Sequence, residues 1–199
     1  MTSKPVPAAI ILAAGSGTRM GSPKLTLTLG SRSYLEVILD RVRTAGIGDI
    51  VVVVQPEFAE FATREGTDKT VAVNPRPEWG MISSMHLGIQ HMKRPVPVMV
   101  VPVDHPFVLA RTYSALIRKA AEFPECVIKP VWKGRPGHPV VIPWKLAIKI
   151  PAEDLPGGLS LFIRRSGIGQ VLTPVADPGI LRNINAPRDI GLAAGRVQG

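Results

Sequence analysis

The stretch IILAAGSGTRMGSPK, residues 10–24, joins an apolar run to a glycine-rich turn that contains an arginine and ends in a lysine. Residues Ala8–Leu12 are short and apolar, which predicts a buried strand. The small residues that follow let the backbone turn tightly, so that successive N–H groups can point at one anion. Arg19 adds a planar fork of donors and Lys24 a mobile ammonium. The stretch therefore predicts a loop that binds a di- or triphosphate.

Two other glycine motifs do not fit this loop. The dinucleotide fingerprint G-x-G-x-x-G fails because the third glycine, Gly21, comes one place late. A P-loop needs a glycine directly before its lysine and a hydroxyl residue after it, whereas Lys24 lies between Pro23 and Leu25. The remaining alternative is an ordinary turn between a strand and a helix, and the two cations favour the phosphate loop over it.

Composition limits the class of protein. The chain has 199 residues, of which 45% are hydrophobic and 5% aromatic, so we expect a single domain with an aliphatic core. The formal charge of +9 favours polyanionic ligands, but the basic residues are scattered and no nucleic-acid-binding signature accompanies them. The single cysteine, Cys126, fits a reducing compartment. With no signal peptide or membrane span in the sequence, we expect a cytoplasmic protein that binds neither nucleic acid nor membrane.

Apolar runs alternate with amphipathic segments along the chain, a pattern typical of a parallel sheet covered by helices on both faces. Strands are predicted at residues 8–12, 49–54, 71–74, 98–103, 127–131, 171–174 and 181–184. Helices are predicted at residues 33–44, 57–65, 83–92, 110–123 and 159–165. Residues 134–143 do not follow this regular alternation of strands and helices. The fold class is therefore α/β, with three α/β/α layers in a Rossmann-like arrangement.

Asp104 directly follows the apolar run 98–103. In open α/β sheets ligands bind outside the carboxyl ends of the strands, so Asp104 and the loop after Ala8–Leu12 should face one crevice. The next residue, His105, is expected to face solvent.

Four motifs together resemble the MobA-like nucleotidyltransferases, and among them most closely the molybdenum-cofactor cytidylyltransferases. LAAGSGTRMGSPK (12–24) resembles the family signature, WGMISSM (79–85) its G-M-x-x-S segment, VDHP (103–106) its D-x-P and GRPGHPVV (134–141) its G-x-x-G-H-P. LAAG resembles the cytidine enzymes, because the guanylyl-transferring relatives usually carry LAGG. The resemblance implies a nucleotidyltransferase fold with a small antiparallel part near the C-terminus.

The resemblance also implies an activity. The chain would transfer a nucleotide monophosphate from a nucleoside triphosphate to a phosphorylated acceptor and release pyrophosphate, most closely as CTP:molybdopterin cytidylyltransferase. Mg²⁺ would be the cofactor and a molybdoenzyme under maturation a further partner. Residues 1–106 would mainly bind the nucleotide and residues 107–199 mainly the acceptor.

The phosphate and metal roles follow from this chemistry. The loop N–H groups of Gly15, Ser16 and Gly17, together with Arg19, would hold the β- and γ-phosphates, and Lys24 would stabilise the α-phosphate.

Asp104 would bind Mg²⁺, which prefers few protein oxygens. Asn185, where cytidylyl relatives often carry a carboxylate, would supply a carbonyl oxygen as second ligand. Arg19, Lys24 and Asp104 are the expected catalytic residues.

Base recognition falls, by resemblance, to the backbone of the first strand end and to a second loop. The residues are Leu12, Ala13, Ala14, Asn74, Gly80, Ser83 and Ser84. A helix N-cap is an alternative role for the two serines. His138 is the expected acceptor-binding residue, with a structural turn histidine as the alternative.

Other functions remain open at this point. The acceptor can instead be a sugar phosphate or a polyol phosphate. A catalytically inactive nucleotide-binding protein is a third alternative, because Asn183 and Asn185 stand where carboxylates are expected.

Overall fold

The computed structural model describes residues 5–15, 23–153, 155 and 157–183. The main sheet contains β1 (Ala8–Leu12), β4 (Ile50–Val54), β5 (Thr70–Val73), β6 (Val98–Pro102), β7 (Val127–Trp132), β8 (Arg135–Pro136), β9 (Val140–Ile142) and β10 (Gln170–Pro174). A separate ribbon is formed by β2 (Thr28–Leu29) and β3 (Arg32–Ser33). The helices are α1 (Tyr34–Thr44), α2 (Ala59–Arg64), α3 (Gly80–Gln90), α4 (Ala110–Glu122), α5 (Trp144–Ala147) and α6 (Gly158–Arg165). Short 3-10 helices are η1 (Lys24–Thr26), η2 (Pro56–Phe58), η3 (Pro77–Trp79) and η4 (Pro178–Leu181).

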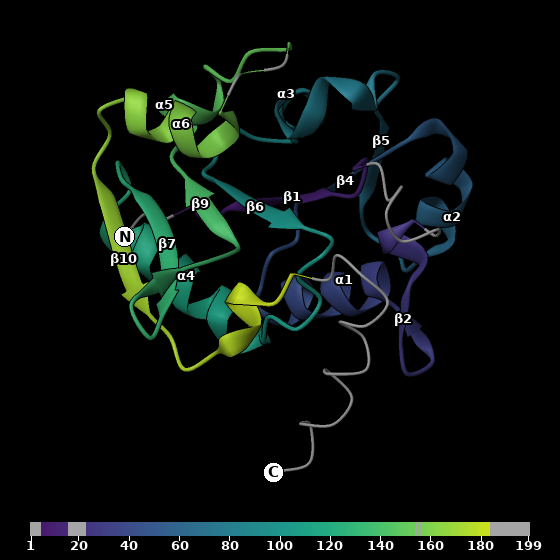
Figure 1. Cartoon of the computed structure of the whole chain (residues 1–199), viewed down its shortest axis with the longest axis horizontal. Helices are drawn as coiled ribbons and strands as arrows, with labels where there is room; N and C mark the ends of the chain where they lie inside the picture. Colours follow the sequence, from purple (N-terminus) through teal and green to yellow (C-terminus); the bar gives the residue numbers. More distant parts are fainter. Residues whose placement is uncertain (1–4, 16–22, 154, 156, 184–199) are drawn as a thin grey trace.

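The strand order of the main sheet is β10-β7-β9-β6-β1-β4-β5, with β8 paired to β7 (Figure 1). Strands β6, β1, β4 and β5 run parallel, as do β7 and β10, whereas β9 is antiparallel to both β6 and β7. The predicted sheet, mostly parallel with a small antiparallel part, is confirmed.

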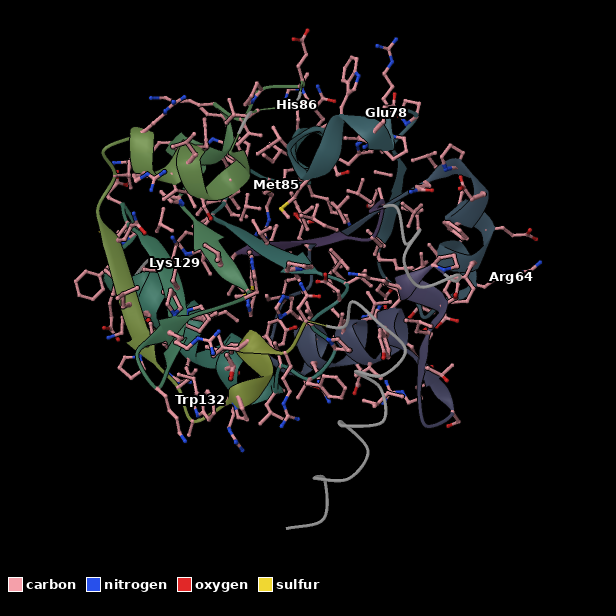
Figure 2. The ribbon with its side chains drawn as sticks, viewed as in Figure 1. Arg64, Glu78, Met85, His86, Lys129 and Trp132 are labelled. Carbon is pink, nitrogen blue, oxygen red and sulfur yellow. The ribbon has the colours of Figure 1, made fainter. Side chains whose placement is uncertain are left out.

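Helices cover both faces of this sheet. In Figure 1, α1 and α4 lie below it, and α3, α5 and α6 lie above it. Each face has its own buried cluster, with Leu35 and Leu116 on the lower side and Ile82 and Met85 on the upper side. Figure 2 shows Met85 between α3 and the sheet. The three-layer α/β/α architecture is therefore confirmed. Among the described residues, no helix is long and apolar enough to cross a membrane.

Helix α3 approaches β1 closely because Gly88 has no side chain. A Cβ at Gly88 would lie 2.6 Å from Cγ2 of Ile10 and 3.2 Å from Cγ2 of Val53. A larger residue would push the helix away from the strand. Gly88 therefore sets the distance between the last turn of α3 and the middle of β1.

The prediction of a strand at residues 181–184 is wrong over residues 181–183, because Leu181 ends η4 and Arg182 and Asn183 lie in no strand. Pro178 fixes the backbone at the first helical position, and the side chain of Asp177 accepts a hydrogen bond from Gly179 N at 2.9 Å. This cap stabilises a tight helical turn, whereas the apolar pattern alone predicts an extended strand. Ile184 lies outside the described residues.

The strand β9 lies within residues 134–143, which the sequence analysis treated as less regular. It has three residues, all buried, and it pairs Val98 with Ile142 and Ile128 with Val141. Because β9 lies between β6 and β7, it joins β7 and β10 to the parallel strands β6, β1, β4 and β5.

Candidate active site

Lys24 is positioned by the short helix η1. Its neighbour Leu25 is 1% exposed and belongs to the buried cluster under the sheet. The turn is closed by Thr26, whose hydroxyl donates to Pro23 O at 2.9 Å. It is tied to α1 by Tyr34 N, which donates to Leu27 O at 2.8 Å. The burial of Leu25 thus anchors the backbone from which the Lys24 side chain extends.

The structure brings Lys24 and Asp104 together. Asp104 lies two residues beyond the end of β6, at the carboxyl edge of the sheet. Lys24 Nζ donates a hydrogen bond to Asp104 Oδ2 at 3.0 Å, and the two side chains are 21% and 19% exposed. The residues predicted to bind phosphate and metal therefore form one partly buried ion pair.

A pocket of about 320 Å³, called the first pocket below, lies at the carboxyl ends of β1 and β6. The predicted site residues that line it are Leu12, Ala13, Ala14, Gly15, Lys24, Gly80, Ser84 and Asp104. Glu78 and Met81, which the sequence analysis did not single out, also line it. The strand-one loop and Asp104 thus face one crevice, as predicted from strand direction.

The backbone at the end of β1 is held from both sides. Ala13 N donates to Val53 O at 2.8 Å, and Gln55 Nε2 donates to Ala14 O at 2.9 Å. Among the described residues, the N–H groups of Ala14 and Gly15 have no hydrogen-bond acceptor. The loop therefore presents fixed donors at the wall of the first pocket, which suits an anionic or carbonyl-bearing ligand.

Asn74 lies behind the first pocket and orients the serines of α3. It is 3% exposed, and its Nδ2 donates to Ser84 Oγ at 2.9 Å and to Ser83 Oγ at 3.1 Å. Its Oδ1 accepts from Arg76 N at 2.9 Å. Ser83 Oγ donates to Gly80 O at 2.9 Å. Since α3 begins at Gly80, the serines lie inside the helix, and the N-cap alternative for them is wrong.

Ser84 is the member of this network that reaches the first pocket. Its hydroxyl oxygen accepts from Asn74, so its own proton is available to donate. Asn74 therefore acts as the support and Ser84 as the donor toward a ligand.

The expectation that His105 faces solvent is wrong. His105 is 7% exposed, and its ring centroid lies 5.0 Å from that of His138. Its Nε2 lies 3.7 Å from Asp104 Oδ1. The cause is long-range packing: η4 lies over this loop, and His138 N donates to Ile180 O at 3.0 Å. His105 therefore links the carboxylate to the predicted acceptor residue.

Burial disfavours the charged form of both imidazoles. Burial lowers the pKa of His105, although the charge of Asp104 acts in the opposite direction. Burial, and next the neighbouring His105, lowers the pKa of His138 to about 4.

A second pocket of about 350 Å³ lies beside the first, and Met81 lines both. His138 lines the second pocket together with Lys129 of β7 and Ser160 of α6. Lys129 was missed by the sequence analysis. The available signal was a lysine within an otherwise apolar strand, VIKPV at residues 127–131.

The donor set at Asp104 fits a divalent cation. Asp104 Oδ1 is buried and has no hydrogen-bond partner among the residues that the structure describes. Within the same part of the chain, no group of three or more His, Cys, Asp or Glu side chains is gathered around a metal position. A single carboxylate is what Mg²⁺ uses when phosphates and water complete its coordination. Ser16, Gly17, Arg19 and Asn185 lie outside the described residues.

The fold and the site together define a class. A mostly parallel sheet with helices on both faces, and a pocket with fixed N–H donors, a lysine and a carboxylate at the strand ends, is a Rossmann-like nucleotide-binding architecture. The model of the MobA-like NTP transferase domain matches residues 9–170, and the chain belongs to this family.

Curated relatives agree with this family. Molybdenum cofactor guanylyltransferase from Rhizobium meliloti (strain 1021) is 31% identical over 154 residues, covering 75% of this chain and 66% of the relative. The chain spans between 19% and 66% of the length of the first curated relatives it matches.

Two solved structures illustrate the shared fold. A nucleotidyl transferase from Methanothermobacter thermautotroptrophicus has a TM-score of 0.76 at 21% identity, covering 94% of this chain and 95% of the other. The complex of Rv0371C with manganese, from Mycobacterium tuberculosis H37Rv, has a TM-score of 0.64 at 18% identity, covering 87% and 91%. At these identities the likeness extends to the fold alone.

Proposed function

We propose that this protein transfers a nucleotidyl group from a nucleoside triphosphate to a phosphorylated acceptor, with CTP as donor and molybdopterin as acceptor. The observation that carries the proposal is the Lys24–Asp104 pair, 3.0 Å apart in the first pocket. Residues 1–106 mainly bind the nucleotide and residues 107–199 mainly the acceptor. A molybdoenzyme under maturation as further partner, and a cytoplasmic location, stay predictions.

The reaction brings two anions together. An oxygen of the acceptor phosphate attacks the α-phosphorus, the bond from that phosphorus to the bridging oxygen of the β-phosphate breaks, and pyrophosphate leaves. No general base is needed, because the acceptor phosphate is already deprotonated. The main obstacle is charge repulsion, so positioning and fixed positive charge must lower the barrier.

Each described side chain has a part in this proposal. Lys24 holds the α-phosphate as negative charge builds on it, and the N–H groups of Ala14 and Gly15 face the nucleotide. Asp104 would hold Mg²⁺ through Oδ1, which has no hydrogen-bond partner among the described residues. Mg²⁺, when bound, neutralises phosphate charge and orients the triphosphate.

One feature favours a pyrimidine base. Ala14 lines the first pocket and is 2% exposed, so its methyl group takes space that a glycine would leave open. Ser84 offers a hydroxyl proton to a carbonyl oxygen or ring nitrogen of the base, which cytosine and guanine both have. GTP is the competing donor, because the Rhizobium meliloti relative is a guanylyltransferase.

Pyrophosphate release with Mg²⁺ tests the proposal across the four ribonucleoside triphosphates, with molybdopterin, a sugar phosphate and a polyol phosphate as acceptors. We expect the highest kcat/KM with CTP and molybdopterin. Ala14→Gly should shift the CTP-to-GTP ratio of kcat/KM toward GTP by about tenfold, the scale of one methyl group in a pocket.

The controls are two lysine variants. Lys24→Ala should lose turnover, whereas Lys145→Ala, at an exposed lysine paired with Glu125, should keep it. Preference for GTP in the unmodified protein would overturn the CTP assignment. Nucleotide binding without turnover for every acceptor would instead identify an inactive nucleotide-binding protein.

A further inference from the structure

The second pocket lies between β7, the connection from β8 to β9 and the start of α6. Among the described residues, its polar side chains are Lys129, His138 and Ser160, and no described carboxylate lines it. Figure 2 shows Lys129 among the strands on the left of the molecule, below α5 and α6. The described walls of this pocket therefore carry positive charge without a compensating negative charge.

Lys129 differs from the other lysines near it in having no acidic partner. Lys24 pairs with Asp104 and Lys145 with Glu125, whereas Lys129 makes no ion pair or side-chain hydrogen bond within the described part of the chain. Its half-buried position lowers the pKa of its ammonium, because water is withdrawn and no counter-charge replaces it. A cation held in this way is stabilised when an anion enters beside it.

His138 connects this lysine to the first pocket. Its ring lies 5.0 Å from that of His105, whose Nε2 lies 3.7 Å from Asp104 Oδ1. The buried Nδ1 of His138 has no hydrogen-bond partner among the described residues. Met81 lines both pockets, so a ligand in the second pocket borders the first directly.

We propose that Lys129 determines acceptor specificity by binding a phosphate monoester group of the acceptor, with His138 and Ser160 as its hydrogen-bonding neighbours. This inference rests on the proposed function, since it names the residue that receives the second substrate. Each substrate then has its own lysine: Lys24 binds a phosphate of the nucleotide, and Lys129 binds the phosphate of the acceptor. A neutral acceptor gains nothing from an unpaired ammonium, so the site selects phosphorylated molecules.

Kinetics of lysine variants test the inference. Lys129→Met should raise the KM for the acceptor about tenfold to a hundredfold, the scale of one lost charge-assisted hydrogen bond, and leave the affinity for CTP unchanged. Lys129→Arg keeps the charge and should recover most of the loss. Lys149→Met removes an exposed lysine from the turn after α5 and should change neither constant. Unchanged acceptor KM in Lys129→Met, or an equal loss of CTP affinity, would overturn the inference.

A binding experiment separates this inference from the proposed function. Inorganic phosphate is titrated into the unmodified protein, Lys129→Met and Lys149→Met, and the ring signals of His138 are followed by NMR. We expect shifts in the unmodified protein and in Lys149→Met and none in Lys129→Met. If those shifts are found while no acceptor supports turnover, the inference stands and the proposed function fails. Absence of shifts in the unmodified protein overturns the inference, whatever the turnover.

Discussion

The two pockets differ in how their charges are arranged. In the first, the ammonium of Lys24 lies 3.0 Å from the carboxylate of Asp104, so these two charges balance each other, and the exposed Glu78 adds a further carboxylate to the wall. In the second, which Lys129 lines, the described residues contribute no carboxylate to the wall. A balanced pair can accept a cation and an anion together, as a metal–nucleotide complex requires, whereas an unpaired ammonium accepts an anion alone. The contrast assigns different ligands to two neighbouring hollows of similar volume.

The largest expected effect comes from breaking the pair in the first pocket. Asp104→Asn removes the negative charge but keeps the shape, and we expect turnover to fall on the order of a hundredfold to a thousandfold and its Mg²⁺ dependence to weaken. Pyrophosphate release measured across a Mg²⁺ series gives both quantities. Asp40→Asn, which removes an exposed carboxylate 3.4 Å from Arg32, is the matched control. Retained turnover with an unchanged Mg²⁺ profile contradicts the role of Asp104.

A smaller effect is expected from the wall of the second pocket. A Cβ at Gly137 would lie 2.3 Å from Ile180 O, so Gly137→Ala must push η4 away from the loop that carries His138. We expect a loss of about 1–3 kcal/mol in the free energy of unfolding, measured in urea, and a raised KM for the acceptor.

Gly48→Ala is the control, because no atom lies within 4 Å of the added methyl group. An equal change in the affinity for CTP and in the KM for the acceptor would show that the two pockets are not independent.

The smallest expected effect is the pH dependence of stability. His138 has a pKa of about 4 in the folded protein against 6.5 when exposed, so the unfolded chain takes up its proton first as the pH falls. Stability is therefore lost between about pH 6.5 and pH 4.

His138→Gln removes the titrating ring. We expect this variant to lose roughly 2 kcal/mol less than the unmodified protein between pH 7 and pH 4.5, measured by urea unfolding at each pH. Parallel pH profiles for the two proteins would mean that the ring titrates normally in the folded state.

The first pocket was more readable from sequence than the second, for a physical reason. Its strands β1, β4 and β6 are runs of five buried residues, and predicted functional side chains follow β1 and β6. Strand direction alone then places Asp104 beside the loop after β1. The sequence therefore predicts that this loop and Asp104 face one crevice, although it does not predict the ion pair between Lys24 and Asp104.

The second pocket depends on contacts that no local pattern contains. Its neighbour β9 has three residues and inserts between β7 and the distant strand β6, a placement that periodicity cannot reveal. His105 is buried because η4 folds over it from a distant part of the chain, and Leu181 belongs to that helix, whose first turn is capped by Asp177. Lys129 lies within an otherwise apolar strand, and nothing in the local pattern marks it as a residue that lines a pocket.

Met81 is the side chain common to both hollows, and it is 44% exposed. A methionine is unbranched and turns about three single bonds, so its thioether can swing aside at little energetic cost. The Met81 side chain that separates the two pockets can therefore move. Molecules of different length can lie across it without any change in the backbone, and a stiff branched residue such as isoleucine at this position would narrow the range of sizes admitted.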